Sequence, residues 1–201
     1  MESERLKIFN EQHEYIGEKT RSEVHEKGFW HETFHCWLVE EDSLYFQLRS
    51  EEKKDYPGLL DITAAGHLLA SETVEDGIRE VEEEIGIRVP FAQLQSLGII
   101  ECAAERKGFI DREFAHTFLL IGAFTDEHFT LEQDEVAGIV RIDFEAFRSL
   151  CKDGCDEVRI EGFKVKDGEK VKVDEMVSQA SFVPHQAEFY LAVLERIDQY
   201  R

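Results

Sequence analysis

Residues 66–87 read GHLLASETVEDGIREVEEEIGI, and this segment sets the architecture of the chain. Its apolar side chains recur at steps of four, three and four residues, at Val74, Ile78, Val81 and Ile85. This spacing places them on one face of an α-helix. The sequence therefore predicts a helix over residues 73–86 that packs its apolar stripe into the core.

The polar face of this helix is acidic. It carries Asp76, Glu80, Glu83 and Glu84, and Arg79 lies one turn before Glu83. Like charges on one helix face repel by about a few tenths of a kcal/mol per pair, so they favour a compensating charge. Mg²⁺ or Mn²⁺ would supply it, because both prefer oxygen ligands. The alternative is an ordinary solvated face, which is our interpretation of Glu75 and Glu82.

The order of residues across the segment resembles the Nudix box. The matching residues are Gly66, Glu72, Arg79-Glu80, the aliphatic Val81, Glu83-Glu84, Gly86 and Ile87. One spacing departs from the family pattern, because six residues separate Glu72 from Arg79 where the family has seven. On these residues the chain is identified as a member of the Nudix superfamily.

This resemblance implies an α/β fold, the Nudix-type α/β/α sandwich with a mixed β-sheet. It implies hydrolysis of the diphosphate linkage of a nucleoside diphosphate joined to another group, or of a similar organic diphosphate. The implied metal ligands are Glu72, Glu80, Glu83 and Glu84. Glu83 and Arg79 are the implied catalytic residues, with Arg79 orienting the carboxylates by charge-assisted contacts. The bound metal would neutralise charge on the phosphates and activate a water molecule.

Flanking residues resemble the branch that includes type I isopentenyl-diphosphate isomerase and its hydrolase relatives. These residues are His25, His31, Arg49, Lys53, His67, Asp111 and Glu113. The resemblance implies that the histidines and the two acids contribute to a further metal site, and that Arg49 and Lys53 bind the substrate diphosphate. We also expect His67 to contact substrate, and Glu113 to be a metal ligand or general base.

Each of these roles has a simpler alternative. Arg49 and Lys53 could be ordinary surface charges, Glu113 could form a salt bridge, and His25 could belong to an exposed turn. His35 shares a strand face with His31, and a structural role is as plausible as metal ligation. The histidines at 116, 128 and 185 lie outside any motif and are expected to be structural or exposed.

Two other functions remain open. Isomerisation is the second hypothesis, although Ala65 stands where the isomerases carry a cysteine and Glu80 restores the Arg-Glu pair of the hydrolases. The third is a non-catalytic module that binds a nucleotide or metabolite. Unchanged product mass would identify the isomerase, and binding without turnover would identify the module.

The remaining elements follow from periodicity and turn signals. Strands are expected at 33–40, 43–50, 94–102 and 112–122, helices near 144–152 and 184–198, and a hairpin insertion over 149–175. We expect one domain over 1–201, with a strand extension at about 1–30 and the insertion plus terminal helix at about 149–201. The repeat of Phe189, Val193 and Ile197 marks a core-facing helix or a homodimer surface.

The composition of the chain limits the classes of molecule that it is expected to bind. The 201 residues include 44 acidic and 23 basic side chains, a formal charge of −21 that disfavours nucleic acid. No apolar run reaches the roughly 18 residues of a membrane span, and the first residues lack a signal-peptide layout, so we expect a cytoplasmic protein with a small-molecule substrate. Cys151 and Cys155 have no second Cys or His pair at a matching spacing, which favours reduced thiols.

Overall fold

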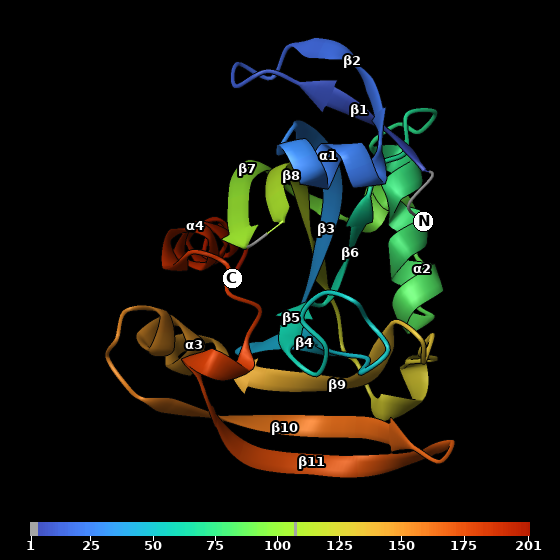
Figure 1. The fold of residues 1–201 in the computed structure, drawn as a ribbon. Coiled ribbons are helices and arrows are strands. Elements are labelled where there is room, and N and C mark those ends of the chain that lie inside the picture. The colour runs from blue at the N-terminus through green and yellow to red at the C-terminus, as the bar shows by residue number, and fades with distance from the viewer. Residues whose placement is uncertain (1–3, 107) are drawn as a thin grey trace.

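The computed structural model describes residues 4–106 and 108–201, and its strands join one mixed sheet (Figure 1). The strands are β1 (Arg5–Phe9), β2 (Tyr15–Thr20), β3 (Trp30–Glu40), β4 (Ser43–Arg49), β5 (Leu60–Ile62), β6 (Ala64–His67), β7 (Gln95–Arg106), β8 (Phe109–Ile121), β9 (Val136–Asp143), β10 (Glu157–Lys166) and β11 (Glu169–Ser178). The α-helices are α1 (Arg21–Lys27), α2 (Arg79–Ile85), α3 (Phe144–Cys151) and α4 (Ala187–Ile197). Short 3₁₀ turns lie at Glu75–Ile78, Phe91–Gln93, Asp126–His128 and Gln179–Ser181.

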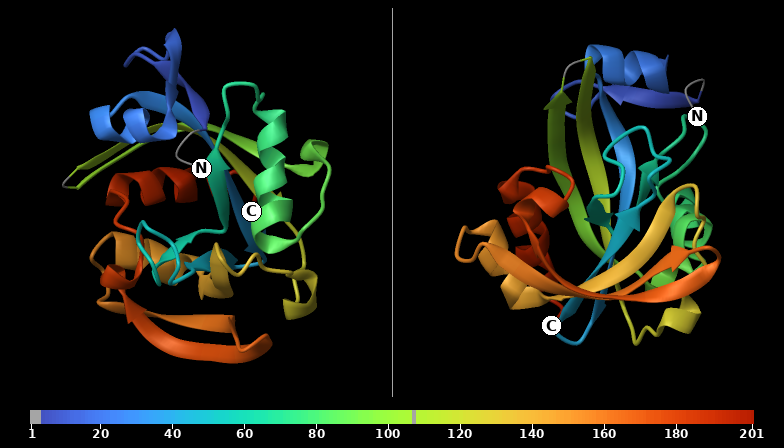
Figure 2. Two further views of the ribbon diagram at one scale, coloured as in Figure 1. Left: turned by 45° about the vertical axis from the view of Figure 1, so that its right-hand side comes forward. Right: turned by 60° about the horizontal axis from the view of Figure 1, so that its bottom comes forward.

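Strand β3 is the centre of the arrangement. It runs parallel to β8, with Trp30–Val39 beside Arg112–Ile121, and antiparallel to β6. It pairs with β4 only at Val39 and Glu40, so the sheet turns there toward β4, β9, β10 and β11. Figure 1 shows these later strands crossing the direction of β3, and both views of Figure 2 place β10 and β11 at the opposite end from β1 and β2.

Alternation along β3 divides the core between two helices. Phe34, Cys36 and Leu38 pack with the apolar stripe of α2. Trp37 and Val39 point the other way and pack with α4. Because side chains of a strand alternate between its two faces, this strand alone places one helix on each side of the sheet. The α/β fold with a mixed sheet is therefore confirmed, and α2 and α4 flank β3 in Figure 1.

The expected hairpins form, with small changes at their ends. Strands β3 and β4 meet at the acidic turn Glu41-Asp42, and β7 and β8 pair antiparallel. The expected insertion consists of β10 and β11, joined at Asp167-Gly168. It is part of the sheet rather than a separate hairpin, because β10 also pairs with β9.

The helix expected over 73–86 begins later. Glu75–Ile78 is a 3₁₀ turn, and α2 starts at Arg79. The side chain of Asp76 accepts hydrogen bonds from the backbone N–H and hydroxyl of Thr73, at 2.8 and 2.7 Å, and so does not join the other carboxylates. These contacts satisfy the backbone N–H of Thr73 locally, and they favour the 3₁₀ turn that precedes α2.

The first 30 residues contain a helix besides the expected strands. Helix α1 begins at a capping box formed by Thr20 and Glu23 and ends at Gly28 in the left-handed region, with φ 66°. It buries His25, so the exposed-turn interpretation is wrong. At the other end of the chain, the stripe of α4 is buried in the core, which favours the core-facing interpretation. The four cysteines are free.

Candidate active site

A cavity of about 540 Å³ opens between α2, β6 and the loop that follows β4. It is lined by every residue to which the sequence assigned a role except Glu72 and His31. Those two residues lie just behind it, Glu72 against Arg79 and His31 against Asp111. The predicted residues are therefore collected in one region, although they come from four strands, two helices and two loops.

Arg79 holds the carboxylates of the motif together. Its Nε donates to Glu72 Oε1 at 2.6 Å, and its Nη1 donates to Glu80 Oε1 at 2.6 Å and to Glu83 Oε2 at 3.0 Å. Its Nη2 donates to the backbone oxygen of His67 at 3.1 Å and to Glu72 Oε2 at 3.1 Å. The shorter spacing before Arg79 therefore still lets Glu72 reach the guanidinium.

Gly66 allows α2 to approach β6 closely. A Cβ atom at this position would lie 2.0 Å from Glu80 Oε1, well inside contact distance. The first glycine of the motif is thus explained by the carboxylate that packs against its backbone.

Two of the carboxylates are held where a negative charge is costly. Burial raises the pKa of Glu84 to about 8, and the charge of Glu80 adds to this effect. Burial also raises the pKa of Glu80 to about 7, because Arg79 offsets it only in part and Glu83 opposes ionisation. Glu84 Oε2 accepts hydrogen bonds from Ala65 N at 3.0 Å and Gln47 Nε2 at 3.2 Å, and neither donor is charged. A divalent cation beside these oxygens would compensate the charge, so this donor set fits Mg²⁺ or Mn²⁺.

The histidines form a second group in the same region. His25 Nε2 and His31 Nε2 lie 3.4 and 3.5 Å from Asp111 Oδ1, and His67 Nε2 lies 3.2 Å from His25 Nε2. His31 Nε2 and Asp111 Oδ1 are buried without a hydrogen-bond partner. Burial, followed by the charge of Arg21, holds the pKa of His67 well below its usual value, which keeps the imidazole neutral as metal ligation requires.

Glu113 lies beside this group but has its own partner. Its Oε2 is 3.3 Å from His35 Nε2, which also lies 3.2 Å from Thr33 Oγ1. The alternatives of an ion pair for Glu113 and a structural contact for His35 thus both have a geometric basis. Glu113 also lies within ligand distance of His31 and Asp111.

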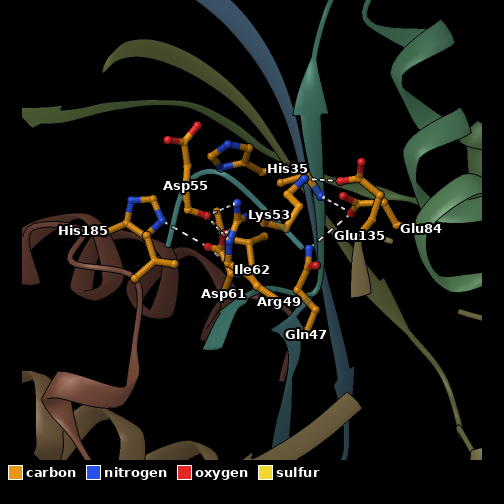
Figure 3. Close-up of polar contacts among 12 residues, drawn as sticks. His35, Gln47, Arg49, Lys53, Asp55, Asp61, Ile62, Glu84, Glu135 and His185 are labelled. Atoms are coloured by element: carbon orange, nitrogen blue, oxygen red, sulfur yellow. Dashed lines mark hydrogen bonds and ion pairs between the residues drawn. The ribbon is translucent and has the colours of Figure 1, made fainter. Parts of the chain in front are cut away.

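Arg49 and Lys53 are not free surface charges. Arg49 Nη1 donates to Asp61 Oδ2 at 2.7 Å, and its Nε and Nη2 donate to the backbone oxygen of Asp55. Lys53 pairs with Glu135. Figure 3 shows Glu84 and Glu135 on one side of Lys53 and the Arg49–Asp61 pair on the other.

Three residues of the cavity were missed by the sequence analysis. His185 Nε2 donates to Asp61 Oδ1 at 3.2 Å, and Cys102 Sγ lies 3.1 Å from His185 Nδ1. Burial raises the pKa of Asp61, but His185 and then Arg49 lower it further, so the acid stays ionised. His185 is thus part of the site. The only signal in the sequence was an acid, Asp61, flanked by the apolar Leu60 and Ile62.

A family model agrees with the geometry. The NUDIX domain model matches residues 30–160, which include all strands of the site and the acidic helix. An uncharacterised Nudix hydrolase of Clostridium acetobutylicum is 39% identical over 202 residues, covering 98% of each chain. Nudix hydrolase 3 of Arabidopsis thaliana is 34% identical over 146 residues, which are 67% of this chain and 19% of the plant protein.

Solved structures share the fold. A crystal structure of DR0079 from Deinococcus radiodurans aligns with a TM-score of 0.59 at 20% identity, covering 75% of this chain and 90% of that one. A MutT protein from Methanosarcina mazei aligns with a TM-score of 0.53 at 15% identity, covering 85% and 94%. No helix among the described residues is long and apolar enough to cross a membrane. With the family model, the full-length relative and the fold in agreement, the chain belongs to the Nudix family and is a Nudix hydrolase.

Proposed function

We propose that the chain hydrolyses a small organic diphosphate with the help of Mg²⁺ or Mn²⁺, and that its preferred substrates are nucleoside diphosphates linked to another group. The observation that carries the proposal is the acidic cluster around Arg79, in which Glu80 and Glu84 have raised pKa values beside an open cavity. Nudix hydrolases are generally dependent on divalent metals. Such a metal would pair with these carboxylates, whose negative charge their present contacts offset only in part.

Glu80, Glu83 and Glu84 would hold the metal, with Glu72 as a further candidate. When bound, the metal neutralises charge on the phosphate oxygens and lowers the pKa of a nearby water molecule. Arg79 fixes the carboxylates through its paired hydrogen bonds, and Glu83, the most exposed of them, reaches into the cavity. Glu113 is the alternative base, although its contact with His35 must then be exchanged.

Arg49 and Lys53 would bind the diphosphate. Both line the cavity, and both are already paired with carboxylates, at Asp61 and Glu135. A diphosphate would therefore compete with these acids for the two cations. An arginine fork and a lysine ammonium are both suited to phosphate oxygens, so the exchange preserves the type of contact.

The test is a substrate panel with Mg²⁺ or Mn²⁺ that contains nucleotide sugars, dinucleotide polyphosphates, nucleoside triphosphates and isopentenyl diphosphate. Product mass and phosphate release are followed. Glu83→Gln should retain the fold and lose activity by orders of magnitude, whereas Glu82→Gln, one position away and paired with Arg88, should remain active. Nearly full turnover by Glu83→Gln would overturn the assignment of this residue.

Isomerisation is the second candidate function, and the histidine group favours it. His25 and His31 contact Asp111, and His67 contacts His25, in the region where the resemblance to isopentenyl-diphosphate isomerase implies a metal site. The backbone of Ala65 donates to Glu84, and its side chain offers no proton. A product of unchanged mass from isopentenyl diphosphate would establish this function in place of hydrolysis.

A further inference from the structure

A further set of side chains that could ligate a metal lies apart from the residues that line the cavity. His13 comes from the turn between β1 and β2, Glu32 from β3 and His116 from β8. His13 Nε2 and His116 Nε2 both donate to Glu32 Oε1, at 3.0 and 2.9 Å. Segments that are far apart in the sequence thus place two imidazoles on one carboxylate oxygen.

The position of His13 is prepared by its surroundings. Its ring stacks on Phe114 with a centroid distance of 4.1 Å, and Phe114 lies opposite Glu32 in the parallel pair of β3 and β8. The backbone of His13 is in the left-handed region with φ 59°, a conformation that costs residues other than glycine about 1 kcal/mol or more. The side-chain oxygen of Asn10 holds the turn by accepting hydrogen bonds from the backbone N–H groups of Gln12 and Glu14. The fold therefore tolerates a strained residue that aims its ring at Glu32.

The chemistry of the three ligands differs from that of the acidic helix. Imidazole nitrogen suits Zn²⁺, Co²⁺, Ni²⁺ and related ions, whereas Mg²⁺ prefers oxygen. The three ligand atoms lie within 4.8 Å of one another, close enough for metal–ligand bonds of about 2.0 to 2.2 Å after small side-chain rotations. The side chains of His13, Glu32 and His116 are 28%, 16% and 15% exposed, so an ion has access from solvent.

We propose that His13, Glu32 and His116 bind a divalent transition-metal ion, such as Zn²⁺, at a site separate from the acidic helix. Binding replaces the two hydrogen bonds to Glu32 with metal bonds from both Nε2 atoms and the carboxylate, and each imidazole then carries its proton on Nδ1, with any excess proton released to solvent. Glu32 is ready for this role, because burial raises its pKa but His116 and His13 lower it further and keep the carboxylate ionised.

Such an ion would fasten the N-terminal hairpin to the sheet. Strand β1 pairs with β3 only at Ile8–His31 and Phe9–Trp30, so the hairpin has a short attachment there. A metal shared by the hairpin turn, β3 and β8 would add a link across all three. The site would thus stabilise the hairpin without entering the hydrolytic cavity.

Trp30 supplies a local probe. Its ring stacks on Phe114 with a centroid distance of 4.6 Å, and Phe114 also stacks on His13. The full chain, held in excess Mg²⁺ to occupy the acidic helix, is titrated with Co²⁺, which quenches indole fluorescence at short range. We expect saturable quenching of Trp30 that Zn²⁺ reverses by competition. Trp30→Phe should remove the quenched emission.

Matched variants separate this site from the other histidines. His13→Ala and His116→Ala should weaken Co²⁺ binding by roughly tenfold or more, because each removes a direct ligand. The double variant His25→Ala with His67→Ala should retain the quenching. His128→Ala should retain it as well, because the ring of His128 only caps an exposed turn. Circular dichroism checks that each variant is folded. No quenching in the wild type, or undiminished quenching in folded His13→Ala, would overturn the proposal.

Discussion

Arg79 is the residue on which the acidic site depends most. It contacts three carboxylates and a backbone oxygen at once. Arg79→Lys keeps the charge but cannot reproduce these forked contacts, so we expect kcat to fall by about 100-fold or more while the fold is retained. The check is kcat at saturating metal. Arg88→Lys is the control, because Arg88 makes an exposed pair with Glu82; similar losses in both variants would contradict the prediction.

The sequence predicted the carboxylates of the helix because their pattern is local. Glu72 to Glu84 lie within one short segment, and helical periodicity brings them together. His185 meets Asp61 across 124 positions and Cys102 across 83. No local pattern encodes such distant contacts, so His185 could only be found in the folded chain. The same reason hid the contact of His116 with Glu32, which are 84 positions apart.

At the scale of elements, the packing of α2 depends on Gly77. A Cβ atom at this position would lie 2.7 Å from Phe34 on β3, too close for both to stay in place. Gly77→Ala should therefore destabilise the fold by about 1 to 3 kcal/mol, the usual cost of overpacking. Urea unfolding measures the change. Glu75→Ala, at an exposed site of the same 3₁₀ turn, should cost far less; equal stability of Gly77→Ala and wild type would show that the helix can shift freely.

Element types were easier to predict than their ends and neighbours. The hairpin of β3 and β4 carries alternating β-favouring residues around an acidic turn, and the sequence predicted it correctly. The 3₁₀ entry to α2 was missed because it depends on Phe34 and on the Thr73–Asp76 contact. Helix α1 was missed because it has only seven residues. The capping box of Thr20 and Glu23 was the one local sign of a helix in this part of the sequence.

For the molecule as a whole, the charge balance shapes how substrate can bind. The formal charge is −21, and the cavity cations Arg49, Lys53 and Arg79 are each paired with acids. A diphosphate would therefore enter a cavity with few uncompensated positive charges. The added charge must come from the metal, which is why we expect substrate binding to weaken strongly when divalent ions are removed.

The burial of two acidic side chains predicts how stability depends on pH. The pKa values of Glu80 and Glu84 are raised to about 7 and about 8, above the usual value of 4.5. Between pH 4.5 and 8 these two sites therefore bind more protons in the folded chain than in the unfolded chain, and they make the free energy of unfolding fall as pH rises. In EDTA, we expect Tm to decrease from pH 6 to pH 8.5.

Mg²⁺ should reverse this loss, and its effect on Tm should be larger at pH 8 than at pH 6, because protonated carboxyls bind metal poorly. His185, with a raised pKa, contributes to the pH slope in the same sense, and His67, with a lowered one, in the opposite sense. The comparison that isolates the acidic site is Glu84→Gln, which should flatten the slope in EDTA and weaken the response to Mg²⁺. If Glu84→Gln kept the wild-type slope and the full Mg²⁺ response, the buried carboxylate of Glu84 would not be the group that Mg²⁺ stabilises.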